Sequence, residues 1–474
     1  MRIFLLTFLC LNSCTWAQSK AEPSAQTLVF TNVNVVDTRA GRILPGMTVV
    51  VRNGRIQGVA RVGLIAENHN VRMINAAGKY MIPGLWDMDV RTASTAAAWN
   101  EHIIYPLYVA NGVTGVRDMG GDPDLLDQRN QRVEDGTLPG PHILVAGLIL
   151  SGGKSNTQTV ALNNPTEARE AVVKLKEHGM NLLTMRSDIS RDSYYALADE
   201  AARLKIQFAG PVPDSITVAE ASAAGQTSIE RLSGILLACS SKEDALRQQG
   251  SQALANQDVR PHASVTTLAM ATYDPEKAWN LFVQLANNNT WQVPALVWSQ
   301  TMASMGDTNL ALDPRLKYVP ISVRRKWELE QLRGRTLPEV LELAKKESAR
   351  ELELVNNMRR AGIQFMAGSD GPEPYVLPGF SLHTELEWLV KSGFSPIQAL
   401  QSATFNPALF LAKLDRFGVL ETGHAADLVL LEANPLEDIR NTRKIAAVVK
   451  TGKYYSRQEL DKMLARVAEA ARSK

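Results

Sequence analysis

The pattern of hydrophobic positions divides the chain into two β-rich ends and an alternating middle. From Thr27 to about Ile82, short runs of β-branched and aliphatic residues are separated by turn residues such as Asn53-Gly54. This spacing is typical of β-hairpins. The same pattern of short hydrophobic runs occurs in residues 426–431 and 445–450. We therefore predict a small sheet domain that is built from both ends of the chain.

Between these ends, apolar strand-like runs alternate with segments of helical periodicity. The candidate strands are residues 84–90, 113–119, 142–148, 181–185, 207–210, 228–231, 292–297 and 364–368. Helix starts are marked by Asp274-Pro275 and by a capping box formed by Ser395 and Gln398. Eight strand–helix units predict an α/β fold with a (β/α)8 TIM-like barrel rather than an open sheet.

The predicted segments are a signal peptide at 1–17, the first part of a β-sandwich at 18–83, the barrel at 84–414, the second part of the sandwich at 415–455 and a C-terminal helix at 456–474. The signal peptide is indicated by a basic start, the apolar run from Ile3 to Leu11 and the small residue Ala17. Lipoprotein processing at Cys14 is the alternative. Both predict an exported protein, periplasmic or secreted, without a transmembrane segment.

Composition narrows the function classes. The 474 residues include 51 Lys and Arg against 49 Asp and Glu, and no long run of one charge occurs. The sequence therefore gives no sign of the basic surface that binding to nucleic acid requires. Only three cysteines are present, two of them in the predicted signal peptide, which excludes a disulfide scaffold.

Four segments resemble the amidohydrolase superfamily, in the branch that includes imidazolonepropionase-like proteins and Xaa-Pro dipeptidases. They are Tyr80-Met-Ile-Pro-Gly-Leu-Trp-Asp-Met88, Val116-Arg-Asp-Met-Gly-Gly121, Gly368-Ser-Asp370 and Gly423-His-Ala-Ala-Asp-Leu-Val429. The resemblance covers nearly all of the predicted mature chain. It implies a barrel with a composite β-sandwich and, for typical members, hydrolysis of C–N bonds.

The resemblance also implies a site for two divalent metals, usually zinc. In the family the ligands are His-x-His on strand one, a carboxylated Lys on strand four, a His on each of strands five and six, and an Asp on strand eight. The matching positions here hold Asp89, Arg91, Thr184, Pro211, Arg231 and Asp370, so only the last ligand is retained. A guanidinium is permanently charged and has no lone pair to donate. We therefore predict that the chain has no metal site and no cofactor.

The residues at these positions suggest a replacement for the metals. We expect Asp89 and Asp370 to form an ion-pair cluster with Arg91 and Arg231, because arginine–carboxylate pairs can be bidentate and specific. Arg186 would add a positive charge and contact an anionic substrate or ligand. The alternative is that the pairs only keep the mouth of the barrel from collapsing.

Three functions fit these residues, and whether the chain is an enzyme stays open. The first is a pseudoenzyme that binds a small anionic or peptide-like ligand. The second is a divergent, metal-poor or metal-independent amidohydrolase, with a vestigial catalytic Asp370 as general base and Arg91 or Arg231 stabilising an oxyanion. The third is the inactive subunit of a homo- or hetero-oligomer with an active relative.

Overall fold

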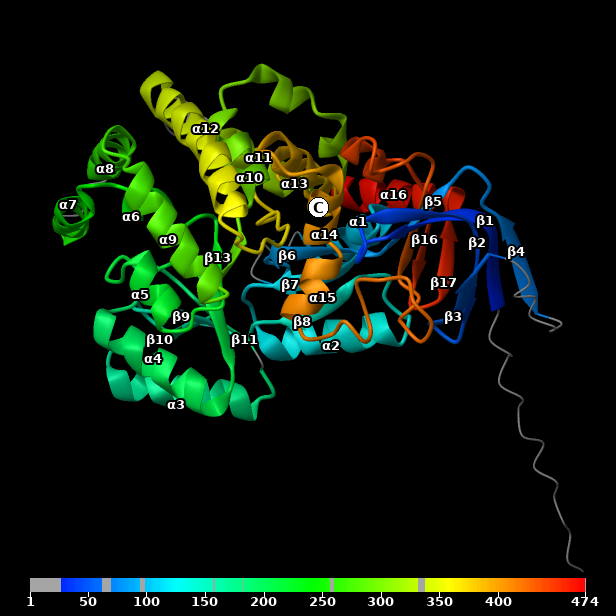
Figure 1. Cartoon of the computed structure of the whole chain (residues 1–474), viewed down its shortest axis with the longest axis horizontal. Coiled ribbons are helices and arrows are strands. Elements are labelled where there is room, and N and C mark those ends of the chain that lie inside the picture. Colours follow the sequence, from blue (N-terminus) through cyan, green and yellow to red (C-terminus); the bar gives the residue numbers. More distant parts are fainter. Residues whose placement is uncertain are drawn as a thin grey trace, which may run out of the picture.

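The computed structural model describes residues 27–61, 70–93, 99–156, 158–180, 182–255, 260–330 and 337–473. The predicted signal peptide, with Cys14, lies outside the described residues. In Figure 1 the strands from the two ends of the chain, blue and red, lie together beside a larger part that is covered by helices. A search of the described residues finds no helix that is long and apolar enough to cross a membrane.

The smaller part is one sheet to which both ends of the chain contribute. Its strands are β1 (Thr27–Asp37), β2 (Arg42–Arg52), β3 (Arg55–Ala60), β4 (Val71–Asn75), β5 (Tyr80–Pro83), β15 (Leu428–Leu431), β16 (Ile445–Lys450) and β17 (Lys453–Ser456). Their order is β17-β16-β15-β5-β1-β2-β3, with β4 also paired to β1. Since β15 runs antiparallel to β5, the two ends meet in the middle of the sheet. Its core combines Phe30 and Val49 from the first segment with Leu428 and Val449 from the second.

Two tight hairpin turns of this sheet pack against each other. Asn53 and Gly54 both have positive φ, 52° and 71°, in the turn between β2 and β3. Thr451 and Gly452, with φ of 50° and 77°, form the equivalent turn between β16 and β17. Positive φ at both central residues is the mark of the type I′ turn, and the hairpin predicted at Asn53-Gly54 is confirmed. A Cβ on Gly452 would lie 2.7 Å from the Cα of Gly54, so the turns touch through backbone.

The larger part is a parallel barrel. Its strands are β6 (Leu85–Val90), β7 (Val113–Asp118), β8 (His142–Val145), β9 (Ile149–Ser151), β11 (Leu182–Met185), β12 (Gln207–Gly210), β13 (Ser228–Glu230) and β14 (Trp291–Val293). β8 pairs with β7. β9 begins four residues after the end of β8 and pairs with β11 on the other side. The extra strand β10 (Thr159–Ala161) pairs with β9. The predicted barrel, rather than an open sheet, is confirmed.

Residues 364–371 close the barrel without forming a regular strand. The amide of Met366 donates to the Gln292 carbonyl at 2.9 Å, and the amide of Met88 donates to the Ala367 carbonyl at 2.9 Å. The segment predicted at 364–368 therefore lies between two strands of the barrel, as expected, but it does not form a regular strand. The strand predicted at 292–297 ends at Val293, because Pro294 has no N–H to donate to a neighbouring strand.

Helices cover the barrel. They are α1 (Glu101–Ala110), α2 (Pro123–Glu134), α3 (Pro165–Glu177), α4 (Arg191–Leu204), α5 (Val218–Ala223), α6 (Ile235–Ala238), α7 (Glu243–Ala255), α8 (Arg260–Ala271), α9 (Pro275–Asn287), α10 (Leu296–Ala303), α11 (Ile321–Glu330), α12 (Pro338–Arg360), α13 (Phe380–Lys391), α14 (Pro396–Ser402), α15 (Phe405–Phe410) and α16 (Arg457–Arg472), with short 3-10 helices at Thr308–Leu312, Pro314–Tyr318 and Ile439–Arg443. Asp274 caps α9, and Ser395 with Gln398 forms the predicted capping box of α14. The last helix, α16, packs against α1.

Candidate functional site

A buried aspartate lies between two arginines where the strands of the barrel end. Arg91 follows β6, Arg231 follows β13, and Asp370 lies in the segment that closes the barrel. Arg91 Nη1 donates a hydrogen bond to Asp370 Oδ1. Arg231 Nη1 lies 3.1 Å from Oδ2, within ion-pair distance but without hydrogen-bond alignment. The Asp370 side chain is fully buried, whereas 29% and 34% of the two arginine side chains are exposed. The guanidiniums therefore stand between the carboxylate and solvent.

Arg231 and Asp370 both adopt the left-handed backbone conformation, each with a φ of 58°. Such a conformation costs a non-glycine residue about 1–3 kcal/mol and often marks a functional position. Main-chain bonds hold it in place. The amide of Asp370 donates to the Asp89 carbonyl at 2.7 Å, and the amide of Arg231 donates to the Val293 carbonyl at 2.8 Å. The barrel backbone thus fixes where this ion pair forms.

Asp89 is buried beside this cluster but takes no part in its ion pairs. Neither of its carboxyl oxygens has a hydrogen-bond partner within the described part of the chain. Burial, reinforced by the negative charge of Asp370, holds the pKa of Asp89 well above its usual range and favours the neutral acid. The expectation that Asp89 shares the arginines was therefore wrong, because Asp370 takes both guanidiniums.

A second ion pair, which the sequence reasoning missed, lies in the barrel interior. Arg117 on β7 is fully buried, and its Nη2 donates to Glu230 Oε1 on β13 at 2.7 Å. Its Nη1 donates to Ser228 Oγ at 3.0 Å, and its Nε donates to the Met88 carbonyl at 2.6 Å. One signal was present in the sequence: Arg117 is a charged residue within a segment that is predicted to be a barrel strand. Such a residue requires a partner.

Arg231 makes a further contact that orients it. Its guanidinium carbon lies 3.6 Å from the centroid of the Trp298 ring on α10, a cation–π contact. Glu351 on α12 is also near enough to Arg231 to interact electrostatically. Burial nevertheless raises the pKa of Glu351 to about 8, so this group is largely protonated at neutral pH. The ion pair of Arg231 is the one with Asp370.

The three other predicted site residues lie at neighbouring strands. Thr184 is buried on β11, and its Cα pairs with that of Ala209 on β12. Pro211 directly follows β12. Arg186 lies just beyond the end of β11 and is exposed, and among the described residues no ion pair involves it. The predicted third positive charge is thus present near the strand ends, but it is not part of the cluster around Asp370.

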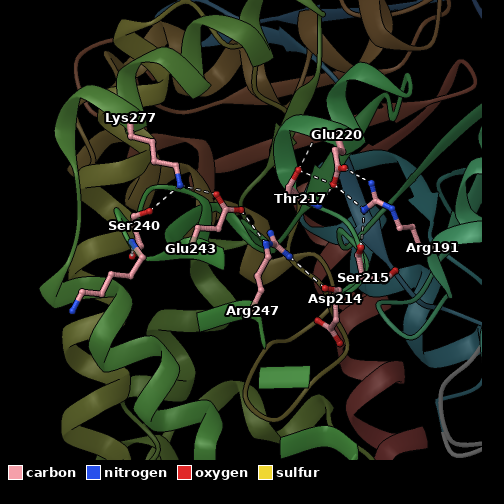
Figure 2. A network of polar contacts seen from close by, with 10 residues as sticks. Arg191, Asp214, Ser215, Thr217, Glu220, Ser240, Glu243, Arg247 and Lys277 are labelled. Carbon is pink, nitrogen blue, oxygen red and sulfur yellow. Dashed lines mark hydrogen bonds and ion pairs between the residues drawn. The ribbon is translucent and has the colours of Figure 1, made fainter. Parts of the chain in front are cut away.

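The loop that follows Pro211 is held by a network of polar contacts (Figure 2). Arg191 on α4 pairs with Glu220 on α5, and its Nη1 donates to the Ser215 carbonyl at 3.2 Å. On the other side, Arg247 on α7 donates to Glu243 Oε1 at 2.9 Å and to the Asp214 carbonyl at 3.4 Å. Figure 2 shows the loop between these two sets of contacts. This part of the rim is therefore anchored from both flanks.

The donor set at the mouth does not fit a binuclear metal centre. Two of its members are arginines, and Pro211 has no side-chain donor atom. Across the described residues, no group of three or more His, Cys, Asp or Glu side chains is arranged to hold a metal ion. Hydrolytic zinc sites need about three protein ligands with an open position. Of the two carboxylates at the mouth, Asp370 is already paired with arginines and Asp89 is deeply buried.

Comparisons with known proteins agree with this architecture. Residues 302–454 match the family described as "Amidohydrolase family". Ochratoxinase from Aspergillus niger is 33% identical over 101 residues, which is 20% of this chain and 20% of that protein. The sequence match thus spans about a fifth of this curated relative.

Solved structures share the fold over almost the whole chain. A protein described as a prolidase from Bifidobacterium longum has a TM-score of 0.66 at 22% identity, covering 94% of this chain and 100% of its own. Bottromycin amidohydrolase has a TM-score of 0.71 at 19% identity, covering 95% and 91%. The ochratoxinase structure has a TM-score of 0.65 at 16% identity, covering 92% and 96%. At these identities the likeness concerns the fold. Residues 302–454 thus match the amidohydrolase family, and the chain as a whole shares the fold of these solved structures.

Proposed function

We propose that this chain is a binding protein with an amidohydrolase fold, which holds the carboxylate of a small peptide-like ligand at the mouth of its barrel. It does not use a binuclear metal centre for hydrolysis. One observation carries the proposal: Arg91 and Arg231 both contact Asp370, at the strand ends where the family resemblance implies metal ligands.

The two guanidiniums offer more donors than Asp370 can accept. Each guanidinium has five N–H groups in a planar fork, whereas the carboxylate has two oxygens. About a third of each arginine side chain is exposed, so both side chains can be reached from solvent. Burial lowers the pKa of Arg91, but Asp370 and Glu373 lie close enough to raise it overall, so carboxylates offset the positive charge of the mouth. Recognition would therefore depend on directed hydrogen bonds to a carboxylate more than on net charge.

The same geometry argues against a metal-independent hydrolase. A general base must face the water that it activates, whereas the two oxygens of Asp370 lie against Arg91 and Arg231. Asp89 cannot replace it, because burial favours its neutral form. Several structural relatives are described as prolidases or Xaa-Pro dipeptidases. A dipeptide with a free carboxylate is therefore a reasonable first ligand to test.

The first experiment measures metal content. Elemental mass spectrometry would be run on protein purified without chelator and again after loading with zinc. We expect clearly substoichiometric metal in both samples. One or two tightly bound zinc ions per chain, or zinc-dependent cleavage of a dipeptide, would overturn the proposal.

The second experiment tests the carboxylate. Binding of Ala-Pro and of its C-terminal amide would be compared by calorimetry, using the wild type and the Arg91→Gln and Arg231→Gln variants. We expect the acid to bind and the amide to bind at least tenfold more weakly, since a charge-assisted hydrogen bond contributes about 1.5–3 kcal/mol. Both variants should lose the preference for the acid. Arg324→Gln, an exposed arginine on α11, is the matched control and should retain it. Equal binding of acid and amide by the wild type would argue against recognition of a carboxylate.

A further inference from the structure

A pocket lies at the other end of the barrel, against the sheet domain. It has a volume of about 160 Å³, and its lining includes Gly54, Arg55, His142, Arg416, Asp427 and Thr451. His142 is the first residue of β8, whereas Asp370 lies where the parallel strands end. The pocket is therefore separate from the site at the mouth. The two stacked hairpin turns provide part of its wall.

His142, Asp427 and Thr451 form the floor of this pocket and belong to a largely buried charged cluster. His142 Nδ1 hydrogen-bonds with Glu134, and its Nε2 lies 2.6 Å from Asp427 Oδ2. Lys450 Nζ lies 2.9 Å from the same ring nitrogen and donates to Thr451 Oγ1 at 2.7 Å. The amide of Thr451 donates to Asp427 Oδ1 at 2.6 Å. Both oxygens of Asp427 are thus already contacted by donors within the protein.

The two arginines of the lining are differently placed. Both are exposed residues. Within the described part of the chain, Arg55 Nη1 donates to the Gly423 carbonyl at 2.7 Å rather than to a carboxylate. Arg416 Nη2 lies 3.8 Å from Glu134 Oε2, too far for a hydrogen bond, and its guanidinium stacks 4.8 Å from the centroid of the Phe417 ring. Both guanidiniums therefore have N–H groups without a hydrogen bond to a carboxylate among the described residues, although Arg416 forms a long ion pair with Glu134.

We propose that this pocket is a binding site for a small oxyanion, a phosphate or a carboxylate group, held by Arg55 and Arg416 above the His142–Asp427 floor. Planar guanidiniums match both groups in bidentate geometry. Since a water molecule takes up roughly 30 Å³ in the liquid, the pocket has room for such a group together with bound water. The ligand would bridge the sheet domain, through Arg55, and the segment that leads from the barrel back into it, through Arg416.

The test uses inorganic phosphate and acetate as separate probes. Each would be titrated into the full chain by calorimetry and by thermal shift, with sodium chloride keeping the ionic strength constant. We expect at least one probe to bind in the millimolar range or better and to raise the melting temperature. The Arg55→Gln/Arg416→Gln double variant should weaken that binding by at least tenfold, because it removes charge-assisted donors. Arg169→Gln, an exposed arginine on α3, is the matched control and should bind as the wild type does.

The outcomes separate the two sites and the two ligand chemistries. Preference for phosphate or for acetate identifies the group that the pocket takes, and either supports the proposal. If binding is lost in Arg91→Gln/Arg231→Gln but retained in Arg55→Gln/Arg416→Gln, the anion sits at the mouth and the proposal fails. It also fails if neither probe binds below about 50 mM, or if both double variants bind as the wild type does. A purely structural role of the cluster would leave the melting temperature insensitive to either anion.

Discussion

Replacing Asp370 by Asn tests the ion-pair arrangement at the barrel mouth most directly. The substitution removes one negative charge from between two guanidiniums and changes little else, since Asn tolerates the left-handed backbone found there. Removing one partner of a fully buried pair costs about 3–5 kcal/mol. Both arginine side chains are about one third exposed and can turn toward water, which lowers the cost. We therefore expect Asp370→Asn to reduce the free energy of unfolding by about 2–3 kcal/mol.

Asp89→Asn is the matched control, because it makes the same chemical change at a buried neighbour. Asp89 has no hydrogen-bond partner within the described residues, and its raised pKa favours the neutral acid. Exchanging it for a neutral amide should change the free energy of unfolding by less than about 1 kcal/mol. Urea denaturation followed by tryptophan fluorescence at neutral pH would compare the variants, with equal m-values required. If Asp89→Asn proves the more costly change, the assignment of the charged carboxylate is wrong.

Three further predictions concern other parts of the chain. Glu230→Leu should lower the free energy of unfolding by about 3–5 kcal/mol, because it leaves buried Arg117 without its partner. The double variant Arg117→Met/Glu230→Leu should regain most of that stability, as measured by urea denaturation. If it does not, the pair itself is needed for stability. Burial would lower the pKa of His142, but its contacts with Asp427 and Glu134 raise it overall. Its contribution to stability is then complete below about pH 6.5 and is lost as pH rises through the folded pKa. His142→Gln should therefore remove this fall in the free energy of unfolding with rising pH. An unchanged dependence on pH would count against the charged cluster. Ser395→Ala should cost about 1 kcal/mol through loss of the cap of α14, and a thermal shift indistinguishable from the wild type would contradict the role of the capping box.

Local patterns were sufficient to predict most of the architecture. The hairpin at Asn53-Gly54 follows from two residues that tolerate positive φ, and the start of α14 follows from the capping box of Ser395. Both depend on contacts within four positions of the sequence. The segment at 364–368 was harder to predict, because its hydrogen bonds go to two different strands that its own sequence does not identify.

The pairing at the site could not be read from local sequence. Asp370, which receives the guanidiniums, has a left-handed backbone and a main-chain bond to the Asp89 carbonyl, and neither feature can be read from the residues next to it. The Arg117–Glu230 pair joins residues 113 positions apart across the barrel. Residue types at matching positions identified the participants at the mouth, but three-dimensional geometry decided their partners.

The composite sheet has a consequence for how the chain reaches its native state. The hydroxyl of Thr38 hydrogen-bonds to the Gly418 carbonyl, a contact between residues 380 positions apart. Ribosomes add roughly 5–20 residues per second, so about 20–80 s of synthesis separate these two partners. During that interval the edge of β5 that later receives β15 has no native partner, and an unpaired edge can recruit another chain. The nascent chain should therefore depend on protection of its first strands until the last ones emerge, and truncation after the barrel should yield aggregation rather than a smaller folded protein.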